Sequence, residues 1–139
     1  KINVCTKTFQ ALRIFVNKET TELIGGLIKA TQFIKQGGKI IIISFHSIED
    51  KIIKYYFTNY SSSKSNPSRY MPSQNNYKNS FFEKYKNNFL TPSEKEIIRN
   101  PASRSAKLRY AIRTEQSFNY PQEFIEKFKR YLDIENVAI

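Results

Sequence analysis

A run of four isoleucines, Ile40 to Ile43, constrains this chain more than any other stretch of its sequence. A glycine pair, Gly37-Gly38, precedes the run, and a polar cluster follows it. Short β-branched runs bounded by glycine are typical of strands that are buried on both faces, as in parallel sheets. We therefore predict a buried strand from Lys39 to about Ser44, within an α/β fold.

The polar turn after this strand is the first candidate site. Ligands of α/β sheets bind beyond the carboxyl ends of the strands, where this chain has Ser44, Phe45, His46 and Ser47. His46 is the chain's single histidine, and one interpretation is that it donates or accepts a proton. In the structural alternative, Ser47 and Asp50 form a helix capping box and His46 bonds a backbone carbonyl. Metal-ligand spacing is absent, so we predict no metal site.

Helical patterns flank the strand, and residues 1–60 are predicted to form a helix–strand–helix segment. Before the strand we expect two helical pieces, or one bent helix, with Asn17 as a cap between them. Gly37 is expected to adopt the left-handed conformation at the end of that helix. After the strand, apolar residues at helical spacing predict a helix from Ile48 to about Tyr60.

Residues 61–88 form a basic, aromatic segment rich in Ser, Asn, Pro and Lys. Pro67 and Pro72 deny this segment a long regular element, because proline removes a backbone donor and fixes φ. We therefore predict a long loop, with one helical turn near Phe81 to Tyr85.

Residues 89–114 are predicted to hold two closing strands, one short and near Phe89, the other from Ala106 to Thr114. In the longer strand, apolar and cationic residues alternate, which indicates a half-exposed strand near an edge. Residues 115–139 are predicted to form a tail helix that begins at Pro121.

The chain carries 23 basic and 12 acidic residues, a net charge of +11. Such an excess indicates a polyanionic partner, either nucleic acid or a membrane surface. No apolar run approaches the roughly 20 residues that span a bilayer, and we expect no membrane partner. A single cysteine, Cys5, permits no internal disulfide and fits a reducing compartment, so a cytoplasmic location is expected.

Cations and aromatic side chains are interleaved from Ser61 to Tyr110. Cations suit phosphates and aromatic rings suit unstacked bases, so this pattern predicts binding to single-stranded or looped RNA. The alternative is a solvated surface in a protein rich in Lys and Asn. The densest cluster supplies the candidate RNA-binding residues, which are Arg99, Arg104, Lys107 and Arg109.

Four blocks of sequence carry a resemblance to a known family. They are TFQALRIFVN at 8–17, Gly37-Gly38-Lys39, ISFHSIED at 43–50, and Asn100-Pro101 followed by RSAKLR at 104–109. In order and spacing these blocks resemble the RsmH (MraW) family. That family comprises S-adenosylmethionine-dependent methyltransferases that act on the exocyclic N4 of a decoding-centre cytosine in 16S ribosomal RNA.

The resemblance implies a Rossmann-like class I fold, of which residues 1–139 would be the carboxy-terminal half. The elements would be a helix, a buried parallel strand, a helix, an antiparallel closing strand pair and a tail helix. The family's glycine-rich cofactor loop and acidic ribose ligand would lie upstream. No residue of this chain is therefore assigned to S-adenosylmethionine, and the chain alone is expected to bind it poorly.

The resemblance also implies roles for the candidate residues. Ser44, His46 and Ser47 would line the target-base side of the catalytic pocket, and the four cations would hold phosphates of the small-subunit RNA or 30S particle. The competing hypothesis is a non-catalytic RNA-binding module that docks on a ribosomal particle. The basic, aromatic segment supports that hypothesis, whereas the motif blocks outside it favour the enzyme.

Overall fold

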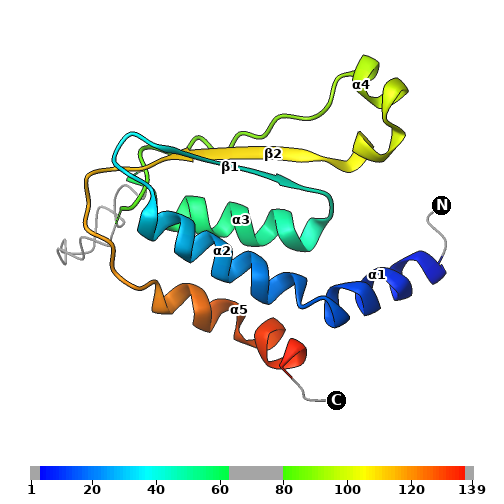
Figure 1. Ribbon diagram of the computed structural model, residues 1–139, viewed down its shortest axis with the longest axis horizontal. Helices are drawn as coiled ribbons and strands as arrows, with labels where there is room; N and C mark the ends of the chain where they lie inside the picture. Colours follow the sequence, from blue (N-terminus) through cyan, green and yellow to red (C-terminus); the bar gives the residue numbers. More distant parts are fainter. Residues whose placement is uncertain (1–3, 63–79, 137–139) are drawn as a thin grey trace, which may run out of the picture. The chain divides into compact units, whose positions relative to one another are not determined.

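The computed structural model describes residues 4–62 and 80–136 (Figure 1). Their elements, in chain order, are α1 (Val4–Val16), α2 (Glu19–Phe33), β1 (Lys39–Ser44), α3 (Ser47–Asn59), α4 (Glu94–Arg99), the 3-10 helix η1 (Pro101–Ser105), β2 (Lys107–Ile112) and α5 (Gln122–Glu135). The chain divides into two compact units, one of residues 1–29 and 121–139 and one of residues 30–120. Among the described helices, none has the length and apolar character needed to cross a membrane.

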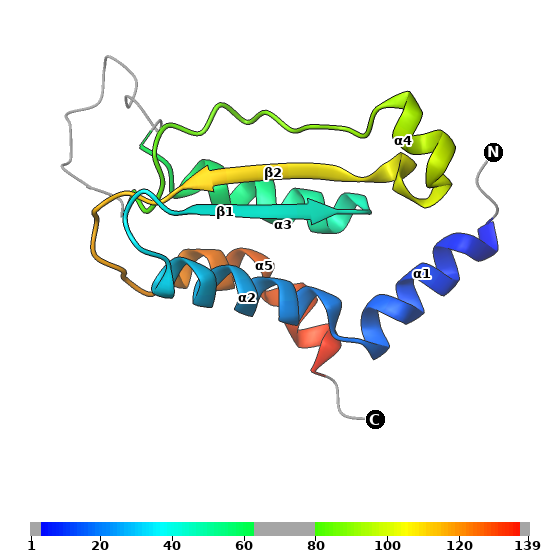
Figure 2. The ribbon, with the colours of Figure 1, turned by 45° about the horizontal axis from the view of Figure 1, so that its top comes forward.

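The larger unit is built on the antiparallel pair of β1 and β2, which lie side by side in Figure 2. Their register pairs Lys39 with Ile112 at one end and Ser44 with Lys107 at the other. Because side chains alternate along a strand, this register sorts them onto two faces. The inner face, toward α3, carries Ile40, Ile42, Ser44, Lys107, Arg109 and Ala111. The outer face carries Lys39, Ile41, Ile43, Leu108, Tyr110 and Ile112.

The isoleucine strand lies where the sequence predicts it, but the prediction that both its faces are buried is wrong for the described part of the chain. Ile40 is buried on the inner face, whereas Ile41 is 60% and Ile43 54% exposed on the outer face. Helix α3 packs on one side of the sheet, and the described residues place no helix over those two isoleucines. Among these residues the only strand paired with β1 is β2, and that pairing is antiparallel.

An aromatic core holds α3 to the segment that begins at residue 80; most of the predicted loop, residues 63–79, lies outside the described residues. Tyr60 stacks on Phe81 with ring centroids 5.1 Å apart, and Phe57 meets Phe82 edge-on at 5.2 Å. Phe82 also forms a β-bridge to Arg113. The predicted helical turn near Phe81 is wrong, because this backbone is bonded in extended bridges on both sides of Phe82.

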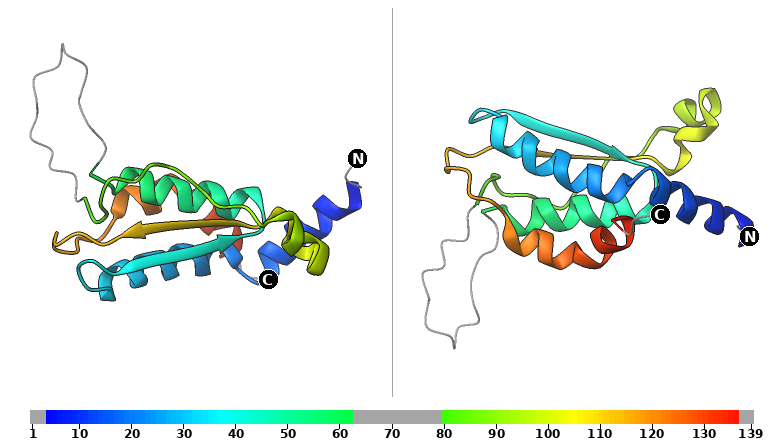
Figure 3. Two further views of the ribbon diagram at one scale, coloured as in Figure 1. Left: turned by 90° about the horizontal axis from the view of Figure 1, so that it is seen from above. Right: turned by 60° about the horizontal axis from the view of Figure 1, so that its bottom comes forward.

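Of the two predicted closing strands, the longer one is confirmed as β2, whereas the shorter one is reduced to a single bridge. The segment near Phe89 makes a single antiparallel bridge, in which Leu90 and Leu108 exchange two N–H···O bonds of 2.9 Å. Pro92, two residues after Leu90, has no backbone N–H to extend the ladder. The chain then turns into α4 and η1, which lie beyond the carboxyl end of β1 in both views of Figure 3.

The smaller unit confirms the predicted helices but changes one cap. Among the described contacts, the predicted cap Asn17 donates through Nδ2 to Glu19 Oε1 at 3.3 Å and makes no bond to the first N–H groups of α2. Instead, the buried Glu135 at the end of α5 accepts hydrogen bonds from the N–H of Thr20 at 3.0 Å and from that of Thr21 at 2.8 Å. A carboxylate at a helix N-terminus also interacts favourably with the helix dipole. In the larger unit, the predicted left-handed conformation of Gly37 is confirmed, with φ of 75°.

Candidate functional site

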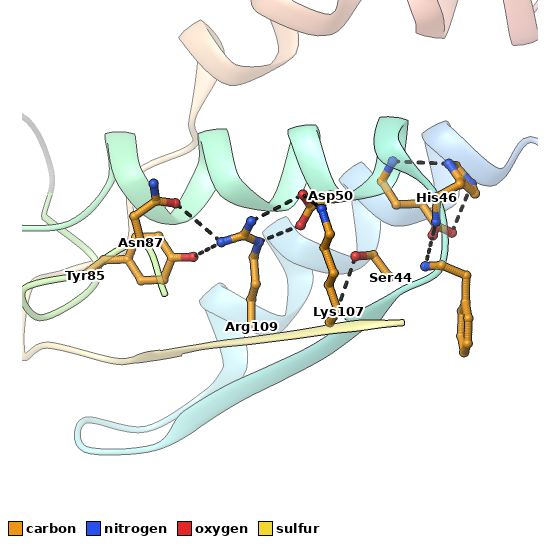
Figure 4. A network of polar contacts seen from close by, with 9 residues as sticks. Ser44, His46, Asp50, Tyr85, Asn87, Lys107 and Arg109 are labelled. Carbon is orange, nitrogen blue, oxygen red and sulfur yellow. Dashed lines mark hydrogen bonds and ion pairs between the residues drawn. The ribbon is translucent and has the colours of Figure 1, made fainter. Parts of the chain in front are cut away.

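The turn after β1 is organised by a capping box, one residue earlier than predicted. His46 is the N-cap of α3, and its Nδ1 accepts a hydrogen bond from the Glu49 N–H at 3.4 Å. In return, Glu49 Oε2 accepts from the N–H groups of Phe45 at 2.9 Å and His46 at 3.4 Å (Figure 4). The predicted box of Ser47 and Asp50 is therefore wrong, because an imidazole nitrogen serves as the cap acceptor.

The three predicted catalytic side chains lie in this one turn but in different surroundings. Ser44 is buried, and its Oγ donates to the Lys107 carbonyl at 3.4 Å. The His46 side chain is 8% exposed, and its Nε2 lies 3.4 Å from Glu49 Oε1. Ser47 is exposed in the first turn of α3. The two imidazole nitrogens thus both face Glu49, one its backbone N–H and the other its carboxylate.

Four residues after His46, Asp50 joins α3 to β2 through an ion-pair network. Its carboxylate accepts from Arg109 Nε at 2.7 Å and Nη2 at 3.2 Å, and from Lys107 Nζ at 3.2 Å. Arg109 Nη1 donates to the Tyr85 hydroxyl at 2.9 Å (Figure 4). The two-point contact of guanidinium and carboxylate fixes both distance and orientation, so it locks the start of α3 over β2.

The network keeps its charges although it is largely buried. Burial alone would raise the pKa of Asp50, but hydrogen bonds from Arg109 and Lys107 outweigh it and hold that pKa below the usual value of 3.8. For Arg109, burial works to lower the pKa, and the bonds to Asp50 and Tyr85 more than reverse this, so the pKa is raised. Burial also raises the pKa of Tyr85. Asp50 and Arg109 are therefore both ionised at neutral pH.

The four predicted RNA-binding cations do not share one environment. Arg99 and Arg104 are exposed on α4 and η1. Lys107 is 38% exposed, whereas Arg109 is only 3% exposed. Lys107 and Arg109 also lie 5.0 Å from the centre of the Phe89 ring, a cation–π distance. The structure therefore unites Lys107 and Arg109 in an internal network and leaves Arg99 and Arg104 open to solvent.

A groove of about 320 Å³ lies beyond the carboxyl end of β1. Its lining residues come from the outer face, the Phe45 turn, the segment after Phe89, α4 and η1. They are Ile43, Phe45, Leu90, Thr91, Pro92, Glu96, Asn100, Ser103, Ala106 and Leu108. The position of Phe45 at the strand end was a signal for this site, but nothing in the sequence linked it to Glu96 and Asn100.

Comparison with known proteins assigns the chain. Residues 1–114 match the model of the MraW methylase family. The chain belongs to this family. It is 44% identical over 115 residues to the ribosomal RNA small subunit methyltransferase H of Bartonella grahamii, a match that covers 83% of this chain and 34% of the relative. The corresponding protein of Hyphomonas neptunium is 43% identical over 109 residues, covering 78% and 32%.

The family match covers part of this chain, and this chain covers part of each relative. The chain spans about a third of the length of these curated relatives. The capping turn, the ion-pair network and the groove all lie within the matched residues 1–114. Helix α5 lies outside the match, although its Glu135 caps α2 within it.

Proposed function

We propose that this chain is part of an S-adenosylmethionine-dependent methyltransferase acting on the exocyclic N4 of a decoding-centre cytosine in 16S ribosomal RNA. Its partner would be the 30S particle or its RNA, in the cytoplasm. The observation that carries the proposal is family membership, together with relatives more than 40% identical that are named as ribosomal RNA small subunit methyltransferases. The high positive charge of the chain supports an RNA substrate.

The proposed fold is a Rossmann-like class I sheet completed by the rest of the protein. The exposed Ile41 and Ile43 support this, because apolar side chains on the outer face gain stability only when another layer covers them. The antiparallel arrangement of β1, β2 and the Leu90 bridge supports the closing edge of such a sheet. Residues 1–139 would be its carboxy-terminal part.

The described residues do not themselves fit a site for S-adenosylmethionine. The acids near the end of β1 are already engaged, Glu49 in the capping box and Asp50 with Arg109. The described glycine pair next to β1, Gly37-Gly38, precedes the strand and is far from its carboxyl end. We therefore assign the cofactor to the rest of the protein, and no step here depends on how it is bound.

Methyl transfer to an amine requires orientation of the nitrogen lone pair, exclusion of water and removal of a proton. We propose that the turn of Ser44, His46 and Ser47 borders the target base. His46 acts through the cap and Ser44 through its bond to β2, so both are positioning residues.

The cap offers a direct test of that role in the complete protein. His46→Asn keeps a side-chain acceptor at the N-cap, whereas His46→Ala removes it. A positioning role predicts that Asn retains methylation within about threefold and that Ala loses about tenfold, with RNA affinity unchanged in both. Equal loss in the two variants would instead assign a proton-transfer role to the imidazole.

RNA phosphates are the proposed ligands of Arg99, Arg104 and the partly exposed ammonium of Lys107. Arg109 is better suited to hold Asp50, because its guanidinium is buried and bonded to that carboxylate and to Tyr85. This division separates the cations that bind substrate from the cation that supports the site.

The decisive experiment supplies the complete protein with methyl-labelled cofactor and 30S particles, then identifies the labelled nucleoside by mass spectrometry. We expect a methylated cytidine with the label on N4. Label on another nucleoside would overturn the proposed target. Binding to the particle with no methyl transfer would favour the non-catalytic RNA-binding module.

A further inference from the structure

We propose that the edge of the sheet beyond β2 binds the RNA backbone, one ribose and its two flanking phosphates, with Lys84 and Lys86 as phosphate ligands and the main chain of Tyr110 as the ribose ligand. This inference rests on the proposed function, because it assumes an RNA substrate. It concerns a nucleotide other than the target, held at the edge that faces away from β1.

The pairing along this edge of β2 has a gap. The segment after Phe82 runs beside β2 on the side away from β1 (Figure 2). It is bridged to β2 at Phe82–Arg113 and at Leu90–Leu108, and between these bridges residues 83–89 face the shorter stretch 109–112. An excess of residues on one strand forms a bulge and disrupts the ladder locally. We call residues 83–89 the edge bulge.

The gap leaves the main chain of Tyr110 open. Alternate residues of an antiparallel strand bond to the same side. Leu108 exchanges two hydrogen bonds with Leu90, and the Ile112 carbonyl accepts from the Glu83 N–H at 2.9 Å, so Tyr110 directs its own N–H and carbonyl toward the edge bulge. None of the described hydrogen bonds along this edge reaches Tyr110. These groups lie in the plane of the sheet, so a layer that covers the outer face does not have to cover them.

Tyr85, at the centre of the edge bulge, holds the bulge in place. Its hydroxyl accepts a hydrogen bond from Arg109 Nη1 at 2.9 Å, and its ring meets that of Phe57 edge-on at 5.5 Å. Asn87 has a left-handed backbone, with φ of 56°, a conformation that asparagine tolerates better than most residues. A site that is fixed before binding loses little conformational entropy when its ligand arrives.

The cavity between the edge bulge and residues 110–112 has the size and charge for a nucleotide backbone. Its volume is about 170 Å³, below the roughly 300–1,000 Å³ of small-molecule sites, so it suits a phosphate and the edge of a ribose better than a whole nucleoside. Lys84 and Lys86 line it, both are exposed, and the described residues form no ion pair with either. Glu83 is the one acid among the lining residues, so cations outnumber acids there.

The main chain of Tyr110 can distinguish RNA from DNA. Backbone N–H groups and lysine ammonium groups both bind phosphate oxygens. The Tyr110 carbonyl is an acceptor beside its N–H, and the ribose 2′-hydroxyl, which DNA lacks, is a donor beside the 3′-phosphate. Neither contact involves a base edge, so the site is expected to accept any base.

Titration of the isotope-labelled chain with a uridine oligonucleotide of about six residues and with the matching deoxyuridine strand, followed by NMR, tests this assignment. We expect the RNA to bind about fivefold more tightly than the DNA, as one additional hydrogen bond predicts, with a large shift of the Tyr110 amide. The double variant Lys84→Gln, Lys86→Gln should reduce the log–log salt dependence of RNA binding by about 1.4, the value for two phosphate contacts to a single strand.

The double variant Lys51→Gln, Lys54→Gln is the matched control, because it removes two exposed cations from α3. It should keep both the salt dependence and the preference for RNA, and unchanged spectra away from the edge bulge would show that each variant folds. Equal affinity for the RNA and DNA strands, or the same loss of salt dependence in both double variants, would overturn the inference.

The inference and the proposed function fail in different ways. Methylation of 16S RNA by the complete protein, with no preference for RNA at the edge bulge, would remove only this backbone site. A preference for RNA with a shifted Tyr110 amide, but no methylation by the complete protein, would keep the site and remove the enzymatic function.

Discussion

The two faces of the β1–β2 pair differ in an unexpected way, because the inner face buries cations among its apolar residues and the outer face exposes apolar side chains. The inner face buries Arg109 and shelters Lys107, and α3 supplies Asp50 to neutralise them. The outer face exposes Ile41, Ile43 and Tyr110. Charge on a buried face is tolerated because a fixed partner compensates it. Exposed apolar side chains at the outer face are the kind of surface that receives a ligand or another layer of protein.

The helix that covers a sheet, here α3, decides which face of each strand is internal. Alternation in β2 separates cations from apolar residues, but it carries no information about which set α3 will cover. The internal face fixes the position of the turn through the Asp50 network. The outer face carries the groove beyond β1 and the apolar side chains that we expect the rest of the protein to cover.

The largest expected effect comes from breaking the inner ion pair. Asp50→Asn should lower the free energy of unfolding by about 3 kcal/mol, because it leaves the buried Arg109 charge without its partner. Urea denaturation of the chain measures the change. The double variant Asp50→Asn, Arg109→Met should recover part of the loss. A loss in the double variant equal to the sum of both single losses would contradict the paired arrangement.

Ile40 and Ile41 lie on opposite faces of β1, so the same substitution at each position compares the two faces directly. Ile40→Ala should cost about 2 kcal/mol because it opens a cavity against α3. Ile41→Ala, on the exposed outer face of this chain, should cost less than about 0.5 kcal/mol. Thermal or urea unfolding of both variants gives the comparison, and equal losses would mean that the outer face is covered in solution.

The lowered pKa of Asp50 predicts how the contribution of the inner ion pair to stability depends on pH. Below pH 3.8 the unfolded chain takes up the proton more readily, so the ion pair's contribution is complete above that pH and is lost as the pH falls through the folded-state pKa. The stability difference between the chain and Asp50→Asn should therefore be constant from pH 5 to 7 and shrink below it. A difference that persists at the acid end would argue against ionisation of Asp50.

The smallest expected effect concerns the solvent-exposed cations. Arg104→Gln should reduce the salt dependence of RNA binding by about 0.7 in the log–log slope, as expected for one lost phosphate contact to a single strand. Lys51→Gln, which removes another exposed cation, on α3, is the control and should leave the slope unchanged. Equal reductions would mean that the charge acts as a diffuse field with no defined phosphate site.

The sequence was informative where a local signal decides the structure. Helical periodicity located α2, α3 and α5, and Gly37 marked a left-handed position that other residues adopt at a cost. The buried-strand prediction held for the inner half of the isoleucine run and missed the outer half, because the described part of the chain places no element over that half.

The parts that could not be predicted depend on contacts between distant residues. Glu135 caps α2 from more than a hundred residues away, and this displaced the local candidate Asn17. Asp50 has capping-box spacing to Ser47, yet the cap forms with His46 and Asp50 bonds β2 instead. Likewise, only the fold brings Glu96 and Asn100 to the groove beside Phe45.

Ultraviolet crosslinking of the complete protein to 30S particles tests most directly that substrate RNA meets the outer side of the turn. Tryptic digestion isolates residues 40–51, the peptide that contains Phe45. We expect this peptide to carry a crosslinked nucleotide, and Phe45→Ala to abolish that crosslink while crosslinks elsewhere persist. RNA attached to other peptides, with none on residues 40–51 in the unaltered protein, would contradict the placement of substrate RNA at this turn.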